Sequence, residues 1–188
     1  VYDVRRKIGA QMCVESPIKA DAVCTVPDSG TAYAVGYSER SGIPFMECLI
    51  KNRYMGRTFI MPTQEKRERA VRIKLNPIPD HLQSRSIILV DDSIVRGTTS
   101  RRIIQTMRDA GAREIHMRIG SPIIKAPCYL GVDMPTRTEL IGSDKDVEQV
   151  RRSITATSLH YLSMEALVDA IGLPKHDLCL GCLTGCYP

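Results

Sequence analysis

The sequence predicts an α/β fold in which helices flank a parallel sheet. Two observations support this class: short apolar segments alternate with helix-like segments, and loops of small polar residues follow the apolar segments. Because ligands bind at the carboxyl ends of parallel strands, these loops are the candidate site. The 188 residues, 43% of them hydrophobic and 25% charged, suffice for one buried domain and a smaller appendage.

The strands are predicted from short apolar runs that turn-forming residues bound. The clearest run is Ile87-Ile88-Leu89-Val90, which contains no polar residue and is typical of a buried strand. In chain order, the predicted strands are residues 21–26, 45–50, 86–91 and 114–119.

The helices are predicted from apolar residues that recur every three or four positions. Val4, Ile8 and Met12 show this spacing at the start of the chain, and Gly42 and Gly111 follow two later helices. In chain order, the predicted helices are residues 2–14, 31–41, 98–110, 145–154 and 163–171, with a charged, helix-prone segment at 63–73. The two prolines within residues 76–80 are expected to break the chain's regular structure.

The predicted organisation is a main domain at residues 1–144 and a C-terminal part at residues 145–188, which holds two helices and a cysteine-rich segment. Because the helical spacing begins at once and the first residue is not Met, we expect further residues before Val1. No run of 18 apolar residues and no signal peptide is present, so we expect a cytoplasmic protein without a membrane span. The net charge of +5 is spread over several segments, which fits a small polyanionic substrate, and no nucleic acid is expected as a partner.

The most informative motif is IILVDDSIVRGTTS, residues 87–100. Asp91 and Asp92 stand where the predicted strand ends, and Gly97-Thr98-Thr99-Ser100 leads into the next helix. The amides of such a loop, with the positive end of the helix dipole, hold a phosphate, and the two acids can hold ribose hydroxyls and a divalent metal. An ordinary helix N-cap after a strand explains the same residues. The strings GxxxxGKS/T and GxGxxG are absent, which argues against a P-loop nucleotidase and a dinucleotide fold.

Two further loops follow predicted strands. Pro27-Asp28-Ser29-Gly30-Thr31 can present backbone amides to an anion, although a plain turn with Ser29 or Thr31 as N-cap is the simpler interpretation. KNRYMGRTFI, residues 51–60, places basic and aromatic side chains around a glycine. This pattern suits a loop that closes over an anionic substrate and excludes water, and the alternative is a solvated charged loop.

These motifs resemble those of a known enzyme family. DDSIVRGTTS resembles the phosphoribosyl pyrophosphate (PRPP) motif of type I phosphoribosyltransferases. Together with VPDSG, KNRYMGRTFI, SPIIKAPC, YLGVDMPT and CLGCLTG, in this order, it makes the chain similar to the phosphoribosyltransferase domain of glutamine PRPP amidotransferases. The resemblance implies a type I phosphoribosyltransferase fold and a pentosyltransferase reaction. Ammonia, taken from glutamine in the whole enzyme, would attack C1 of PRPP to give 5-phosphoribosylamine and pyrophosphate, the first committed step of purine biosynthesis.

The resemblance also implies roles for individual residues. The catalytic residues implied are Lys51, Tyr54, Arg57 and Phe59. The PRPP-binding residues implied are Ser29, Gly30, Lys74, Asp91, Asp92, Ser93, Arg96, Gly97, Thr98, Thr99 and Ser100. Mg²⁺ is implied at Ser29, Asp91 and Asp92, together with the pyrophosphate. For Lys74, an ordinary surface lysine is an equal alternative, and Met55 stands where the family more often has Val.

The chain contains no nucleophilic constellation, and the chemistry needs none. Ammonia is already neutral and reactive, so its attack on ribose C1 requires a fixed ribose, charge stabilisation on the pyrophosphate and a dry site. The histidines, which show no metal-ligand spacing, are expected to be structural or exposed. They are His81, His116, His160 and His176.

The seven cysteines fall into two groups. Cys13, Cys24 and Cys48 lie beside apolar residues and are predicted to be small core residues. Cys179-Leu180-Gly181-Cys182 is a CxxC motif, which by itself fits redox, zinc or iron–sulfur chemistry.

Resemblance to the cluster-bearing amidotransferases implies that Cys128, Cys179 and Cys182 bind a 4Fe-4S cluster, with a fourth ligand upstream of Val1. Zinc is the competing metal. Cys186 stands where we expect a lysine, and it either completes the site or is a free thiol.

The resemblance further implies an N-terminal glutaminase domain that is not in this sequence, feedback inhibition by purine nucleotides, and a homo-oligomer. Two other functions remain open. A base-salvage phosphoribosyltransferase would need an aromatic hood, whereas the chain has no Trp and only two Phe. A PRPP-sensing regulator could use the same loops and a basic face, although a sensor has no need of a closing loop such as KNRYMGRTFI.

Overall fold

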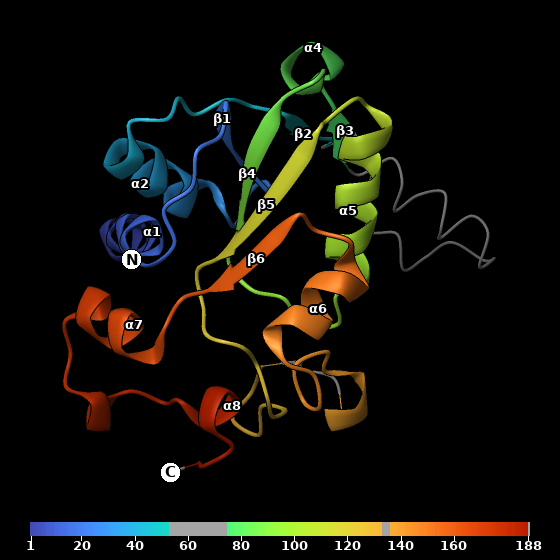
Figure 1. Ribbon diagram of the computed structural model, residues 1–188. Helices are drawn as coiled ribbons and strands as arrows, with labels where there is room; N and C mark the ends of the chain where they lie inside the picture. The colour runs from blue at the N-terminus through green and yellow to red at the C-terminus, as the bar shows by residue number, and fades with distance from the viewer. Residues whose placement is uncertain (53–74, 133–135, 188) are drawn as a thin grey trace.

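A computed structural model of the protein describes residues 1–52, 75–132 and 136–187, in which helices cover both faces of a sheet (Figure 1). The strands are β1 (Ala22–Thr25), β2 (Leu49–Lys51), β3 (Leu75–Pro77), β4 (Ser86–Asp91), β5 (Glu114–Ile119) and β6 (Ser158–Tyr161). The α-helices are α1 (Tyr2–Glu15), α2 (Thr31–Ser41), α4 (Pro79–Leu82), α5 (Thr98–Asp109), α6 (Val147–Ile154), α7 (Met164–Ile171) and α8 (Gly181–Thr184). Two 3₁₀ turns, η2 (Arg137–Glu139) and η3 (Lys175–Asp177), complete the described elements.

The main sheet has the strand order β1-β4-β5-β6, and all its strand pairs are parallel. In the register of the sheet, Leu89 of β4 lies beside Cys24 of β1 on one side and Met117 of β5 on the other. All six residues of β4 are buried. The predicted α/β class with a parallel sheet is therefore confirmed.

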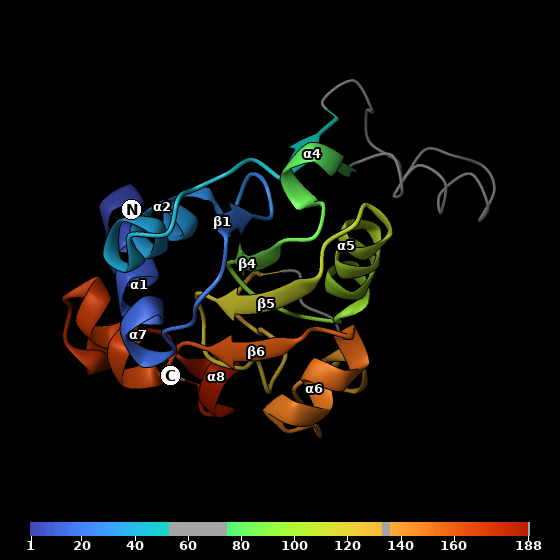
Figure 2. The same ribbon diagram turned by 45° about the horizontal axis from the view of Figure 1, so that its top comes forward.

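Helices pack on both faces of this sheet, with α1, α2 and α7 on one side and α5 and α6 on the other (Figures 1 and 2). The side chains of β4 alternate between the two layers of core. Ile87 and Leu89 belong to one buried cluster, and Ile88 and Val90 belong to the other. This arrangement explains why the β4 segment is apolar at every position from Ile87 to Val90, since both of its faces are covered.

Helices α1 and α2 approach each other closely because glycines lie at their crossing. A Cβ added to Gly36 would lie 2.0 Å from the carbonyl oxygen of Arg6, and one added to Gly9 would lie 1.9 Å from that of Tyr33. Neither position therefore has room for a side chain, and the two helices pack at backbone contact distance.

Three expectations about elements differ from the structure. Residues 45–50 do not form one strand: Phe45 makes a single bridge to Val23, and β2 begins only at Leu49. Residues 76–80 are not simply a break, because β3 pairs with β2 and α4 follows it. Pro77 is tolerated there because it lies in a two-stranded ribbon, where no further described strand needs its missing N–H. The strand β6 was not among the predicted strands.

The strand β6 pairs with β5, so at least residues 158–161 of the C-terminal part extend the main sheet. The boundary expected after residue 144 stays a prediction. The helix-prone segment 63–73 lies outside the described residues. Within the described part of the chain, no helix has the length and apolar character needed to cross a membrane.

Candidate functional site

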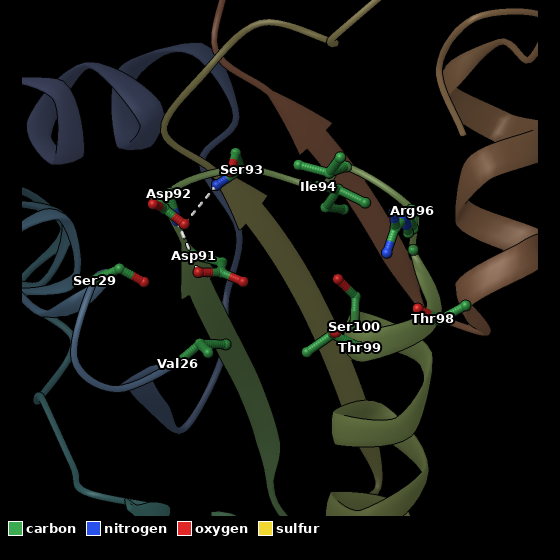
Figure 3. A pocket seen from close by; sticks show the side chains of 12 residues that line it. Val26, Ser29, Asp91, Asp92, Ser93, Ile94, Arg96, Thr98, Thr99 and Ser100 are labelled. Carbon is green, nitrogen blue, oxygen red and sulfur yellow. Dashed lines mark hydrogen bonds between the residues drawn. The ribbon is translucent and has the colours of Figure 1, made fainter. Parts of the chain in front are cut away.

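A pocket of about 470 Å³ opens at the carboxyl ends of β1 and β4 (Figure 3). Nine of the eleven residues that were predicted to bind PRPP line it, and they come from the loop after β1, from the end of β4 and from the segment that leads into α5. The predicted residues in its lining are Ser29, Asp91, Asp92, Ser93, Arg96, Gly97, Thr98, Thr99 and Ser100. The structure therefore brings together two loops that are about sixty residues apart in sequence.

The loop between β4 and α5 has a turn that only glycine accommodates well. Gly97 has φ +76°, in the left-handed region, and a Cβ there would lie 2.4 Å from Cδ1 of Ile141. Directly after this turn, α5 begins at Thr98. Within the described residues, no side chain caps this helix, so its first amides remain available to donate to an anion.

The carboxylates of Asp91 and Asp92 both line the pocket, and Asp91 is the more buried of the two. Asp91 is only 8% exposed, and its Oδ1 accepts a hydrogen bond of 2.9 Å from the Asp92 amide. Burial, followed by the neighbouring Asp92 carboxylate, raises the pKa of Asp91 to about 8, and a hydrogen bond with Ser29 opposes the rise. A cation beside these groups would relieve the repulsion between the two carboxylates.

Ser29 faces Asp91 because the loop after β1 is held against the end of β4. The Val26 amide donates to the Val90 carbonyl at 2.9 Å, and a Cβ on Gly30 would lie 2.6 Å from that same carbonyl oxygen. Gly30 thus lies behind the pocket and is not part of its lining. Its lack of a side chain lets the loop approach β4 closely enough for Ser29 to point toward the carboxylates (Figure 3).

Lys51 lies at the end of β2, and it is joined to the loop after β1. Its Nζ is 2.6 Å from Oδ2 of Asp28. The other predicted residues of this loop and the next segment, Tyr54, Arg57, Phe59 and Lys74, lie outside the described residues and stay predictions.

Sequence reasoning missed several residues of the pocket and its surroundings. Val26, Ile94 and Val95 also line the pocket, and Ile94 is 2% exposed. Behind the loop, Glu139 pairs with Arg96, and Ile141 contacts the turn at Gly97. The apolar character of Ile94 and Val95 within a polar motif was a usable signal, whereas nothing local in the sequence marks Glu139 or Ile141.

The cysteines divide as expected between core and tail. Cys13, Cys24 and Cys48 are buried, which confirms the prediction for them, and the described chain contains no disulfide. In the tail, the carbonyl of Cys182 accepts hydrogen bonds from the amides of Lys125 and Ala126, at 2.9 and 3.1 Å. The CxxC segment is thereby fixed against the segment that holds Cys128.

Burial, followed by the nearby thiol of Cys128, raises the pKa of Cys182, and Cys179 contributes in the same direction. The three cysteines therefore lie in one region, whose donors suit a soft metal. Among the described residues, however, no group of three or more His, Cys, Asp or Glu side chains is already arranged to hold a metal ion.

Comparisons with known proteins agree with the resemblance of the motifs. No protein-family model matches the chain. Curated relatives named amidophosphoribosyltransferase include one from Methanothermobacter thermautotrophicus, 59% identical over 188 residues, and one from Bacillus subtilis, 47% identical over 192 residues. Both alignments cover the whole of this chain and 40% of the relative, so the chain spans about two fifths of the length of these proteins.

Two solved structures are also similar to this chain over its whole length. Glutamine PRPP amidotransferase from B. subtilis, complexed with ADP and GMP, has a TM-score of 0.90 and 46% identity, over all of this chain and 42% of that one. A structure described as the allosteric regulatory enzyme of purine biosynthesis also gives a TM-score of 0.90 and 46% identity, over 41% of its chain. The fold is therefore that of the PRPP amidotransferase structures, the type I phosphoribosyltransferase fold.

Proposed function

We propose that this chain is the phosphoribosyltransferase part of an amidophosphoribosyltransferase. It transfers ammonia to C1 of PRPP and releases pyrophosphate. The observation that supports this most directly is the pocket in which Ser29, Asp91 and Asp92 meet the uncapped start of α5. The relatives that share the sequence around this pocket, at 46–59% identity over the whole chain, have this enzyme's name.

The pocket residues and the predicted catalytic residues have separate tasks in this reaction. The amides at the start of α5 and the hydroxyls of residues 98–100 bind the 5′-phosphate. Asp91 and Asp92 accept hydrogen bonds from the ribose hydroxyls, which fixes the ring for attack at C1. Lys51, with the predicted cations Arg57 and Lys74, stabilises negative charge on the leaving pyrophosphate. Tyr54 and Phe59 help to exclude water when the loop closes.

The donors in the pocket also fit Mg²⁺, which favours oxygen ligands and combines few carboxylates with substrate phosphates. Ser29, Asp91 and Asp92 would hold it. When bound, the cation neutralises charge on the pyrophosphate. The buried Asp91 has to lose its proton before it can serve as a ligand, so the environment that raises its pKa also makes metal binding sensitive to pH.

The cysteine-rich tail is proposed to hold a 4Fe-4S cluster through Cys128, Cys179 and Cys182. The hydrogen bonds from residues 125 and 126 to Cys182 support this, because they bring the two cysteine-bearing segments together. A fourth thiolate would come from outside this chain. Zinc remains the alternative, since thiolates suit both metals.

The whole protein is proposed to contain more than this chain. More than half of the length of the curated relatives lies outside the match, which leaves room for the glutaminase domain that supplies ammonia. A solved relative contains ADP and GMP, which supports regulation by purine nucleotides. We further propose that the protein is cytoplasmic and that it forms a homo-oligomer.

Pyrophosphate release from PRPP and Mg²⁺ tests the proposed reaction. The chain is assayed with ammonium chloride and, separately, with each purine and pyrimidine base. Release that depends on ammonia supports the proposal, and release that depends on a base would assign the chain to the salvage enzymes. PRPP binding without any release, in the chain and in the whole protein alike, would favour a PRPP sensor.

A further inference from the structure

Arg96 stands between two cavities. It lines the pocket described above, and it also lines a second cavity of about 330 Å³, to which Glu139 contributes as well. In that second cavity, Nη2 of Arg96 lies 3.2 Å from Oε1 of Glu139. The side chains are 56% and 48% exposed, so the pair is in contact with solvent.

Glu139 is held in place independently of Arg96. Its other carboxylate oxygen, Oε2, accepts hydrogen bonds of 3.2 Å from both the amide and the hydroxyl of Thr136, and the bond from the amide is part of a capping box at η2. The same segment is attached to the loop, because the Ile141 amide donates to the Val95 carbonyl at 2.9 Å. The carboxylate is therefore fixed within reach of Arg96.

We propose that Glu139 is a positioning residue that sets the affinity of this loop for phosphoryl groups by acting as the counter-ion of Arg96. The inference rests on the proposed function, in which the loop binds the 5′-phosphate. A phosphoryl oxygen that approaches the guanidinium has to share it with, or displace, the Glu139 carboxylate. Half-exposed ion pairs change an equilibrium constant by a factor of roughly 1.5 to 5, so the loss of this one has a small but measurable effect.

The substitution E139Q separates the charge from the shape. Glutamine is accepted at this position of a capping box, so the turn at η2 is retained while the negative charge is lost. The dissociation constants of ribose 5-phosphate and of PRPP are measured by calorimetry, without turnover. We expect tighter binding of both ligands by roughly two- to fivefold, and a smaller gain at high salt because exposed charges are screened.

Two further variants make the test specific. In an R96Q background, E139Q is expected to change neither dissociation constant, because its effect acts through Arg96. E148Q is the matched control, since it removes the same charge from an exposed glutamate that pairs with Arg151 and Arg152 on α6. It should leave both constants unchanged. During turnover, the effect of E139Q should appear in the KM for PRPP and not in kcat.

The outcomes distinguish this inference from the function on which it rests. Weaker or unchanged binding in E139Q, or a gain that persists in the R96Q background, would overturn the role of Glu139 while the phosphate site stands. If the wild-type protein binds neither ribose 5-phosphate nor PRPP, the proposed function and this inference both fail.

Discussion

Nζ of Lys51 lies 2.6 Å from Oδ2 of Asp28, and this ion pair joins the end of β2 to the loop after β1. The two side chains are 44% and 60% exposed, so the pair contributes little to folding stability. The ion pair instead fixes a position. It holds the positive charge of Lys51 beside the loop that presents Ser29 to the carboxylates of the pocket.

Loss of the Lys51 charge should therefore affect turnover and not folding. We expect Lys51→Met to lower kcat/KM for PRPP by at least roughly tenfold, because a cation near a leaving pyrophosphate is lost. The free energy of unfolding should change by less than about 1 kcal/mol. Steady-state kinetics and urea titrations measure the two effects. Lys19→Met, which removes an exposed lysine elsewhere, is the control, and equal kinetics in the two variants would exclude a role for Lys51.

The carboxylates should matter far more for activity. Asp91→Asn and Asp92→Asn each keep the size of the side chain but remove a negative charge from the pocket. We expect each to lower turnover of PRPP by roughly a hundredfold. Asp109→Asn, on the exposed end of α5, serves as the control. Turnover near that of the wild type in both pocket variants would contradict the assignment of the site.

Asp91 should also give the protein a characteristic dependence of stability on pH. Its pKa is raised to about 8 from an ordinary value near 3.8, so the folded state keeps a proton that the unfolded state has lost. In EDTA, this group therefore lowers the free energy of unfolding as pH rises from about 4 to about 8, by at most about 1.4 kcal/mol for each pH unit.

Urea titrations between pH 5 and pH 8 measure this dependence. In Asp91→Asn the corresponding part of the slope should disappear, and the variant should gain stability relative to the wild type toward pH 8. Parallel stability curves for the two proteins would show that Asp91 titrates normally in the folded state.

The turn at Gly97 should be sensitive to a single methyl group. Gly97→Ala forces a Cβ both into the left-handed region and to within 2.4 Å of Ile141 Cδ1. Gly42→Ala is the matched control, because Gly42 has φ +72° and nothing among the described residues lies within 4 Å of the position that its Cβ would take. We expect the control to lose about 1 kcal/mol of stability from strain alone and Gly97→Ala to lose about 2–3 kcal/mol.

The KM for PRPP should rise in Gly97→Ala only, because the strain falls on the loop that is proposed to bind the phosphate. Adding Ile141→Val, which removes the Cδ1 atom, should restore part of the stability. Equal losses of stability in the two alanine variants would show that the Ile141 side chain moves aside without destabilising the fold.

The tail should reveal its metal in the whole protein. We expect anaerobically purified protein that includes the upstream cysteine to be brown, with iron and sulfide in equal amounts, and Cys179→Ser or Cys128→Ser to bleach it. Cys186→Ser, which changes an exposed thiol shortly after Cys182, is the control and should stay brown. A colourless protein with stoichiometric zinc would contradict the cluster assignment.

Local sequence patterns were sufficient to predict the elements whose residues all lie in the same environment. The β4 segment is apolar from Ile87 to Val90 because both faces of the strand are covered, and its position was predicted without error. β6 was missed because Ser158-Leu159-His160-Tyr161 mixes polar and apolar residues on a strand at the edge of the described sheet, which only pairing with β5 makes regular. The prediction of one strand at residues 45–50 was wrong for the opposite reason. The apolar residues of this segment pack against the core, but they do not form a continuous ladder of strand hydrogen bonds.

The sequence alone was enough to predict the order of most strands and helices, the two acids at the end of β4 and the loop of small polar residues that follows them. These features could be predicted because burial, helix capping and turns each require particular residue types within a few positions of one another. Three relationships become visible only in the folded chain: Ser29 faces Asp91, Asp28 pairs with Lys51, and Glu139 pairs with Arg96. These relationships join residues more than twenty positions apart, which no local pattern can encode. The first exists because the parallel sheet brings the carboxyl ends of β1 and β4 to one edge, whereas the other two depend on where β2 and η2 lie in the fold.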